Sequence, residues 1–287
     1  MAVAFTALRE APSDSLADGL HAPLPLTDPG GRTFCWQHLR VQISGSIVLV
    51  MLSNPPANSF SGEMFDAVNE MLDTLEADAV HAVILTGEGG NFSLGADLRD
   101  ILRVTREDVR ASQRVCQRIE AFPKPWIAAI NGHCLGGGLE IALACHLRIA
   151  SSRAKLGMPE VSLGLLPGMG GTHRLPRLIG RSRAHEMILT GRPLRAEEAA
   201  AIGLVSAVVP PGDLLATAER LARRIAVKSP AAVRAAMRCL NTDFCSAGEH
   251  AELMEMESFE ELSKTPVVRR TLTAIERDLG AGRENDV

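Results

Sequence analysis

The sequence lacks tyrosine altogether, and aromatic side chains make up only 3% of its 287 residues. Any mechanism that needs a phenol as proton donor is therefore excluded. The Gly-x-Ser-x-Gly pattern of a nucleophilic serine is absent, and so is the Gly-Lys-Ser/Thr end of a P-loop. The glycines of residues 87–90 do not have the Gly-x-Gly-x-x-Gly spacing of a dinucleotide site. Serine-hydrolase chemistry and an ATP or dinucleotide cradle are disfavoured.

No apolar run reaches the roughly 18 residues that a membrane span requires. The formal net charge of −4 provides no overall basic field, so nucleic acid and anionic membrane surfaces are not expected partners. The six cysteines form no Cys-x-x-Cys pair and have no zinc-site spacing, so we expect no metal and a reducing compartment. Acidic residues within 1–31 argue against a secretory signal or a mitochondrial presequence. These features predict a cytoplasmic protein.

Short apolar runs and helical periodicity alternate in the first two thirds of the chain. Strands are predicted within 41–52 and at 81–87, 126–130, 146–150 and 204–209. Helices are predicted at 61–77, 105–122, 139–145, 172–179, 182–189, 196–201, 213–226, 230–240, 247–263 and 266–279. Strands that alternate with helices indicate an α/β fold with a parallel sheet. We expect a loosely ordered N-terminal extension (1–33), an α/β core (34–210) and a helical C-terminal region (211–287).

The most informative stretch is residues 126–172. In it, Gly136, Gly137 and Gly138 open a short apolar helix. Backbone N–H groups at a helix start carry partial positive charge and suit a phosphate or a developing oxyanion. A tight packing contact between helix and strand explains a glycine run equally well. The glycines alone leave both explanations open.

Two glutamates in this stretch, Glu140 and Glu160, have apolar neighbours. Burial raises the pKa of a carboxyl group and a helix N-terminus lowers it, so Glu140 is expected to exchange protons near neutrality. One such glutamate alone is more simply a structural hydrogen-bond acceptor. Two that flank a predicted strand can converge on one pocket and activate a water molecule together.

Other polar side chains are weaker candidates. The histidines of this region, His133, His146 and His173, are interpreted as packing or hydrogen-bonding residues, because no serine or cysteine nucleophile accompanies them. The three arginines Arg99, Arg103 and Arg106 can meet a phosphate, although a solvated surface is the commoner explanation for such a group.

Six motifs, taken together, resemble the enoyl-CoA hydratase/isomerase (crotonase) superfamily. They are Val83–Gly87, Phe92–Leu98, Ile127–Gly132, Gly136–Glu140, Pro159–Glu160 and Pro167–Thr172. The match runs from about residue 41 to about residue 245 in the right order. Locally, residues 54–58 and 144–150 look like the hydratase part of multifunctional fatty-acid oxidation enzymes.

The resemblance implies a fold and a site. The fold is an α/β spiral of ββα turns with C-terminal helices that form homotrimers or dimers of trimers. The oxyanion hole maps onto the N–H groups of Ala96 and Gly137, and the catalytic acids map onto Glu140 and Glu160. The implied substrate-binding residues are Ala57, Ala96, Asp97, Leu98, Arg99 and Gly137, with Arg99 placed to approach a coenzyme A phosphate.

The presence of both acids favours an enoyl-CoA hydratase, in which water adds to a 2-enoyl-CoA thioester in the syn sense. Fatty-acid metabolism is then the implied setting. Coenzyme A is part of the substrate, so no separate cofactor is implied. Alternatives are a Δ3,Δ2-enoyl-CoA isomerase, a dehydratase acting on a carrier-protein thioester, and a scaffold or RNA-binding member of the superfamily. Net acidity and the intact acid pair argue against the last of these.

Overall fold

The computed structural model divides the chain into two compact units, Met1–Ala226 and Val227–Val287. The residues that it describes are 32–36, 38–54, 57–77, 80–97, 103–241, 265, 266 and 270. In the second unit, helix α8 (Pro230–Asn241) is described and matches the helix predicted there. Residues 1–31 of the expected N-terminal extension and the helices predicted at 247–263 and 266–279 lie almost wholly outside the described residues. The domain boundaries at 33 and 210 therefore stay predictions.

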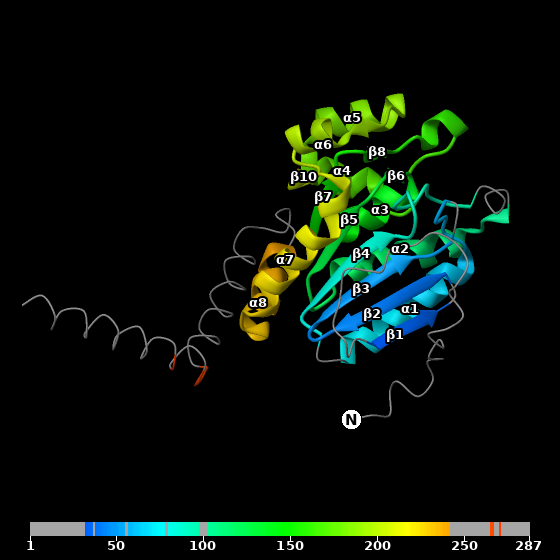
Figure 1. The fold of residues 1–287 in the computed structure, drawn as a ribbon. Coiled ribbons are helices and arrows are strands. Elements are labelled where there is room, and N and C mark those ends of the chain that lie inside the picture. Colours follow the sequence, from blue (N-terminus) through cyan, green and yellow to red (C-terminus); the bar gives the residue numbers. More distant parts are fainter. Residues whose placement is uncertain are drawn as a thin grey trace, which may run out of the picture. The chain divides into compact units, whose positions relative to one another are not determined.

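The first unit is built on a large mixed sheet, shown in Figure 1. Its strands, in spatial order, are β1 (Arg32–Trp36), β2 (Leu39–Ser44), β3 (Ile47–Leu52), β4 (Ala82–Gly87), β5 (Trp126–Ile130), β7 (Leu147–Ser151) and β10 (Ala207–Val209). The two hairpin pairs from β1 to β3 are antiparallel, and every pair from β3 to β10 is parallel. The parallel sheet expected from the sequence is confirmed.

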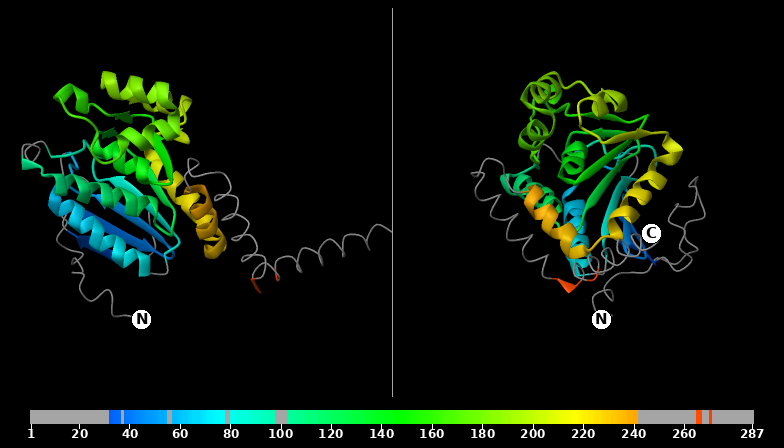
Figure 2. Two further views of the ribbon diagram at one scale, coloured as in Figure 1. Left: turned by 180° about the vertical axis from the view of Figure 1, so that it is seen from behind. Right: turned by 90° about the vertical axis from the view of Figure 1, so that its left-hand side faces the viewer.

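Both faces of the middle of this sheet are covered, which explains why β3, β4 and β5 are buried along their whole length. In β4, Val83 and Leu85 belong to a large core on one face, whereas Ala82 and Ile84 belong to a smaller core on the other. The large core contains buried residues of α1 (Gly62–Ala77), α2 (Arg106–Glu120) and α3 (Gly137–Ala144). The smaller core is closed by α7 (Leu214–Ala226), which can be followed in the two views of Figure 2.

A small second sheet lies in the same unit, formed by β6 (His133–Leu135), β8 (Lys155–Gly157) and β9 (Leu194–Arg195). The remaining elements are η2 (Glu160–Leu163), α4 (Gly171–Ile179), α5 (Arg181–Thr190), α6 (Ala196–Ala201) and η3 (Pro211–Asp213). Strands β8 and β9 were not predicted, because two or three residues are too few to show a period. The pairing of β8 with β6 places the segment that leads into Glu160 beside the segment that leads into α3.

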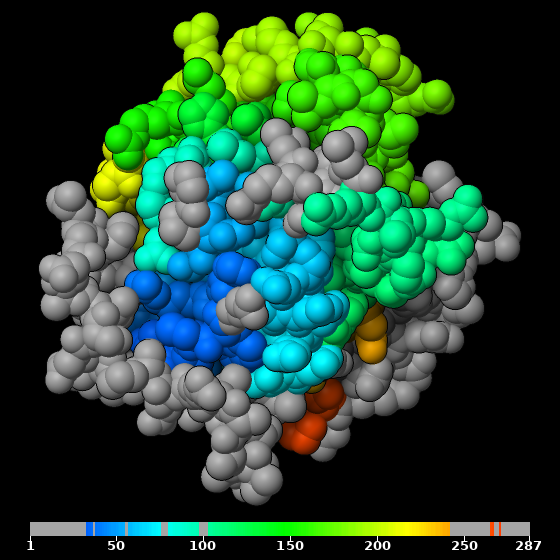
Figure 3. Space-filling view, turned by 90° about the vertical axis from the view of Figure 1, so that its right-hand side faces the viewer, coloured from blue at the N-terminus to red at the C-terminus, as the bar shows by residue number. Residues whose placement is uncertain are grey.

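Local sequence signals account for the helices on the outer face. Thr105 and Asp108 form a reciprocal capping box that starts α2, with the Thr105 N–H donating to the Asp108 carboxylate at 2.8 Å. Arg118 then ties α2 to α1 by donating to Asn69 Oδ1 at 2.8 Å. Figure 3 shows α1 (cyan) beside α2 (sea green) on this surface.

Among the described residues, no helix has the length and apolar character needed to cross a bilayer.

Candidate active site

The glycine run turns the chain sharply from β6 into α3. Gly136 has a φ of 53°, and α3 begins at Gly137. A Cβ atom on Gly138 would lie 2.9 Å from Ser93 Cβ and would overlap Ser93 backbone, so the close packing considered from the sequence is real. The first N–H groups of a helix have no partner within it. The glycine run thus allows Gly138 to pack closely against Ser93. It also leaves the Gly137 N–H without a hydrogen-bond partner within the helix.

The second backbone donor comes from the loop that follows β4. Phe60 donates its N–H to Gly95 O at 2.9 Å, and Asp97 donates its N–H to Phe60 O at 3.0 Å. Because the residues on both sides of Ala96 bond to Phe60, the N–H of Ala96 itself points to the opposite side. That side is where α3 starts, since a Cβ on Gly137 would lie 3.6 Å from Ala96 N. The fold therefore brings the two predicted donors together.

The predicted substrate-binding residues are partly described. Ala57 accepts a hydrogen bond from the Leu94 N–H at 2.9 Å, which joins the proline-rich loop to the loop that contains Ala96. The buried side chain of Asn58 fixes the same loop, because its Nδ2 donates to Glu88 O and Asn91 O at 2.9 Å each. Asp97 is half-buried next to Ala96. Leu98 and Arg99 lie outside the described residues.

Glu140 is a buried carboxylate in the first turn of α3, with 2% of its surface exposed. Its Oε1 accepts hydrogen bonds from the N–H groups of Met169 and Gly171, each at 2.7 Å. Burial raises its pKa to about 7, and the charge of Glu160 acts in the same direction. The two backbone donors and the positive charge of Arg174 oppose that rise. The near-neutral pKa expected from the sequence has these causes.

Glu160 is the first residue of η2, and it approaches the glycine turn. A Cβ atom on Gly136 would lie 3.1 Å from Glu160 Oε1, so only glycine fits there without a shift. The other oxygen, Glu160 Oε2, is buried and has no hydrogen-bond partner within the described part of the chain. Burial raises the pKa of Glu160 as well. An oxygen so placed favours the protonated acid or a ligand that hydrogen-bonds to it.

The central histidine of the region is structural. His146 Nδ1 accepts the Trp126 N–H at 3.0 Å, so Nε2 carries the proton and donates to Glu120 O at 3.2 Å. Burial lowers its pKa to about 4, which keeps the ring neutral. His133 has its own polar partner, Asn91 Oδ1, at 3.1 Å. For these two histidines the hydrogen-bonding interpretation is confirmed.

A family model described as enoyl-CoA hydratase/isomerase matches residues 42–278. The chain belongs to this family. One relative is a short-chain-enoyl-CoA hydratase from Clostridium acetobutylicum, 38% identical over 80% of this chain and 91% of its own. Another is a probable enoyl-CoA hydratase from Bacillus subtilis, 40% identical over 75% of this chain and 86% of its own.

A solved structure of an enoyl-CoA hydratase from Bacillus anthracis superposes with a TM-score of 0.80 and is 36% identical, covering 84% of this chain and 97% of that one. The α/β crotonase fold expected from the motifs is thereby confirmed for this member of the enoyl-CoA hydratase/isomerase family.

The sequence predicted Glu140 and Glu160 as acids and Ala96 and Gly137 as donors, but it did not predict the groups that hold Glu140 in place. It did not foresee that the N–H groups of Met169 and Gly171 hold Glu140, or that buried Arg174 lies behind them. The available signal was the glycine-rich start of α4, which repeats the pattern at the start of α3. The bonding partner of such a turn is set by tertiary structure and cannot be read from the pattern.

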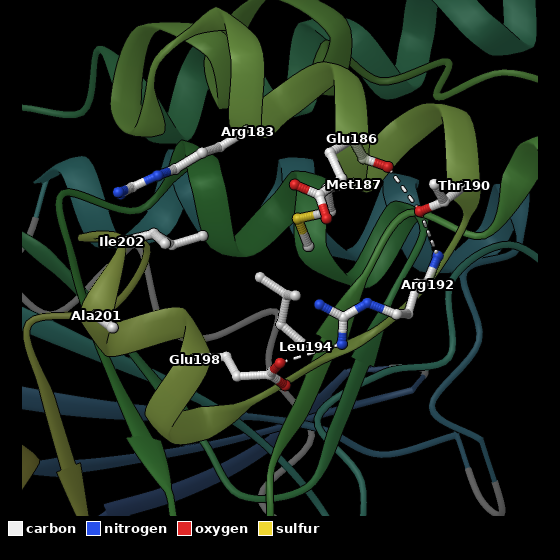
Figure 4. A pocket seen from close by; sticks show the side chains of 9 residues that line it. All are labelled: Arg183, Glu186, Met187, Thr190, Arg192, Leu194, Glu198, Ala201 and Ile202. Atoms are coloured by element: carbon white, nitrogen blue, oxygen red, sulfur yellow. Dashed lines mark hydrogen bonds and ion pairs between the residues drawn. The ribbon is translucent and has the colours of Figure 1, made fainter.

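A separate pocket of about 280 Å³ lies between α5, β9 and α6, as Figure 4 shows. Its walls combine charged and apolar side chains, and Arg192 pairs with Glu198 across it at 3.1 Å. None of the predicted site residues lines this pocket. Among the described residues, no cluster of three or more histidine, cysteine, aspartate or glutamate side chains is arranged to hold a metal ion.

Proposed function

We propose that this protein is an enoyl-CoA hydratase that adds water reversibly to a 2-enoyl-CoA and forms a 3-hydroxyacyl-CoA. The observation that carries the proposal is that two carboxylates, buried Glu140 and half-buried Glu160, lie at the glycine turn that also brings the Gly137 backbone close to Ala96 N. Addition of water to a conjugated thioester needs a base for the water, an acid for Cα and stabilisation of the enolate oxygen. The site contains a group of suitable chemistry for each need.

The N–H groups of Ala96 and Gly137 are proposed to bind the thioester oxygen. Negative charge develops on that oxygen when water attacks the β-carbon, and fixed backbone donors stabilise it without having to reorient. Removing one donor of this kind typically costs about 3 to 4 kcal/mol of transition-state stabilisation. The glycine at the start of α3 also leaves the approach to its N–H free of a side chain.

Glu140 and Glu160 are proposed to handle the protons. A carboxyl with a pKa of about 7 is substantially ionised at neutral pH, so Glu140 can accept the proton of the attacking water. Burial raises the pKa of Glu160, which makes this carboxyl easier to protonate than an exposed one, and Glu160 is proposed to deliver a proton to Cα. The water oxygen becomes the 3-hydroxyl, and the enolate collapses to the thioester as Cα is protonated.

The wider setting belongs to the same proposal. The substrate is an acyl-CoA thioester, the reaction needs no added cofactor, and the protein works in the cytoplasm as a homotrimer or a dimer of trimers. Ala57, Asp97, Leu98 and Arg99 are proposed to contact the substrate, with Arg99 near a coenzyme A phosphate. Sedimentation of the purified protein tests the subunit number directly.

The test is hydration of crotonyl-CoA, followed by loss of the enoyl-thioester absorbance. Glu140→Gln and Glu160→Gln are each expected to lower kcat at least 10²-fold, because general acid–base catalysis contributes about that much or more. Glu186→Gln, on an exposed part of α5, removes the same charge and is the matched control. Wild-type turnover in both site variants would refute the proposal. Product analysis with 3-enoyl-CoA and carrier-protein thioesters distinguishes an isomerase or a carrier-protein dehydratase.

A further inference from the structure

Arg174, in the first turn of α4, is a buried cation behind the proposed site. Only 6% of its surface is exposed. Its Nη1 donates to Met169 O at 2.9 Å, while Nε and Nη2 both donate to Glu120 Oε2 at 3.1 and 2.8 Å. A buried guanidinium is costly unless it is paired and hydrogen-bonded in good geometry. Every one of these bonds therefore constrains where the guanidinium lies.

Met169 is held from both sides. Its N–H donates to Glu140 Oε1, and its carbonyl accepts from Arg174. Gly170 follows with a φ of 107°, and a Cβ atom there would overlap the Arg174 guanidinium. A Cβ on Gly171 would lie 3.1 Å from Glu140 Oε1. The turn from 169 to 171 is thus shaped between the cation on one side and the carboxylate on the other.

We propose that Arg174 is a positioning residue for the hydration reaction. By holding the Met169 carbonyl, it keeps the N–H groups of Met169 and Gly171 aimed at Glu140 Oε1 and so fixes the orientation of that carboxylate. Glu120, at the end of α2, anchors the guanidinium. Arg174 does not itself touch the reacting atoms. The inference rests on the proposed function, since it assigns a role within that reaction.

The positive charge of Arg174 has a second consequence for Glu140. It lowers the pKa of that carboxyl, against the larger effect of burial. Loss of the cation and misalignment of the two backbone donors both favour the protonated form. A residue that only tied α2 to α4 would affect stability without moving the titration of Glu140.

The first experiment compares Arg174→Gln and Arg174→Lys with the wild type in crotonyl-CoA hydration over a range of pH. For Arg174→Gln we expect kcat to fall about 10²-fold, the cost of a displacement of about 1 Å in an active site. The acidic limb of kcat/KM should move to higher pH by about one unit or more, because an opposite charge near a carboxyl is removed.

Arg174→Lys keeps the charge but not the planar guanidinium fork. Its kcat should therefore lie between those of the wild type and Arg174→Gln, and the acidic limb should stay near its wild-type position. Arg183→Gln, exposed on α5, is the charge-matched control and should behave as the wild type.

A second measurement does not depend on turnover. Glutamate labelled with ¹³C at the side-chain carboxyl reports the titration of each site by NMR, and the Glu140 signal is the one missing in Glu140→Gln. A higher Glu140 pKa in Arg174→Gln than in the wild type is expected. Equal Glu140 pKa values in the two proteins would overturn the inference even if the wild type hydrates the substrate.

If the wild type does not hydrate the substrate but the Glu140 pKa changes in Arg174→Gln, the proposed function fails while the coupling of Arg174 to Glu140 stands. If Arg174→Gln does not fold, Arg174→Lys tests the inference instead. Wild-type kcat in Arg174→Lys would show that the guanidinium fork is not required and would overturn the inference.

Discussion

Replacing Glu140 by glutamine is expected to change how the stability of the folded protein depends on pH. Burial raises the pKa of Glu140 from 4.5 to about 7, whereas in the unfolded chain the group returns to its ordinary value. Below pH 4.5 the carboxyl is protonated in both states and has no effect. As the pH rises to about 7, the unfolded state loses its proton first, so the wild type loses stability over this interval.

The size of this effect follows from the two pKa values. Their difference corresponds to a loss of about 3 kcal/mol in unfolding free energy, complete once the pH exceeds about 7. Glutamine has no charge at any pH, and its carbonyl oxygen can still accept from Met169 and Gly171. Relative to the wild type, Glu140→Gln should therefore gain about 3 kcal/mol between pH 4.5 and pH 8.

Urea unfolding at pH values from 4.5 to 8.5 measures the effect directly. The protomer concentration is kept fixed, because subunit association would make stability depend on it. Equal m-values for the two proteins ensure that the midpoints report stability. The control Glu186→Gln shows how much of the change in unfolding free energy comes from the loss of one negative charge rather than from the burial of Glu140. A difference between Glu140→Gln and wild type that stays constant over this pH range would refute the burial argument.

Two further substitutions test the framework that supports the site, both by thermal unfolding. In Gly132→Ala the new Cβ overlaps backbone of a neighbouring loop, so we expect a loss of about 1–3 kcal/mol; Gly62→Ala, with nothing within 4 Å, is the control and should be neutral or stabilising. In His146→Ala the buried Trp126 N–H loses its acceptor, which should cost about 1–3 kcal/mol. Wild-type stability of His146→Ala would contradict the structural role given to that ring.

Long segments with a clear hydrophobic period were predictable from the sequence. The helix expected over 61–77 is α1 at Gly62–Ala77, and the run 126–130 is β5. Such segments can be recognised from the sequence alone, because apolar residues recur on the buried face several times. The strand predicted at 204–209 shrinks to Ala207–Val209, because its first residues contribute to the core without joining the ladder. Element ends depend on contacts that a local pattern does not record.

The sequence predicted those candidate site residues whose side chain and neighbours are unusual in themselves. Glu140 and Glu160 stand out because a carboxylate among apolar neighbours is expensive, whereas Ala96 has an unremarkable side chain and came only from the family resemblance. The role proposed for the Ala96 N–H rests on the pair of bonds that its neighbours make to Phe60, thirty-six positions away. Backbone donors of this kind depend on the fold and have no fixed residue type.

The supports of Glu140 show why its pKa falls near neutrality. Burial alone favours the protonated acid, and a neutral group cannot act as a base. The N–H groups of Met169 and Gly171 and the charge of Arg174 favour the ionised form, so the two tendencies nearly balance. Because neither donor is a side chain, the balance depends on the shape of the turn from 169 to 171. That shape in turn depends on Arg174, so a mutation behind the site is expected to alter its acid–base behaviour as surely as one within it.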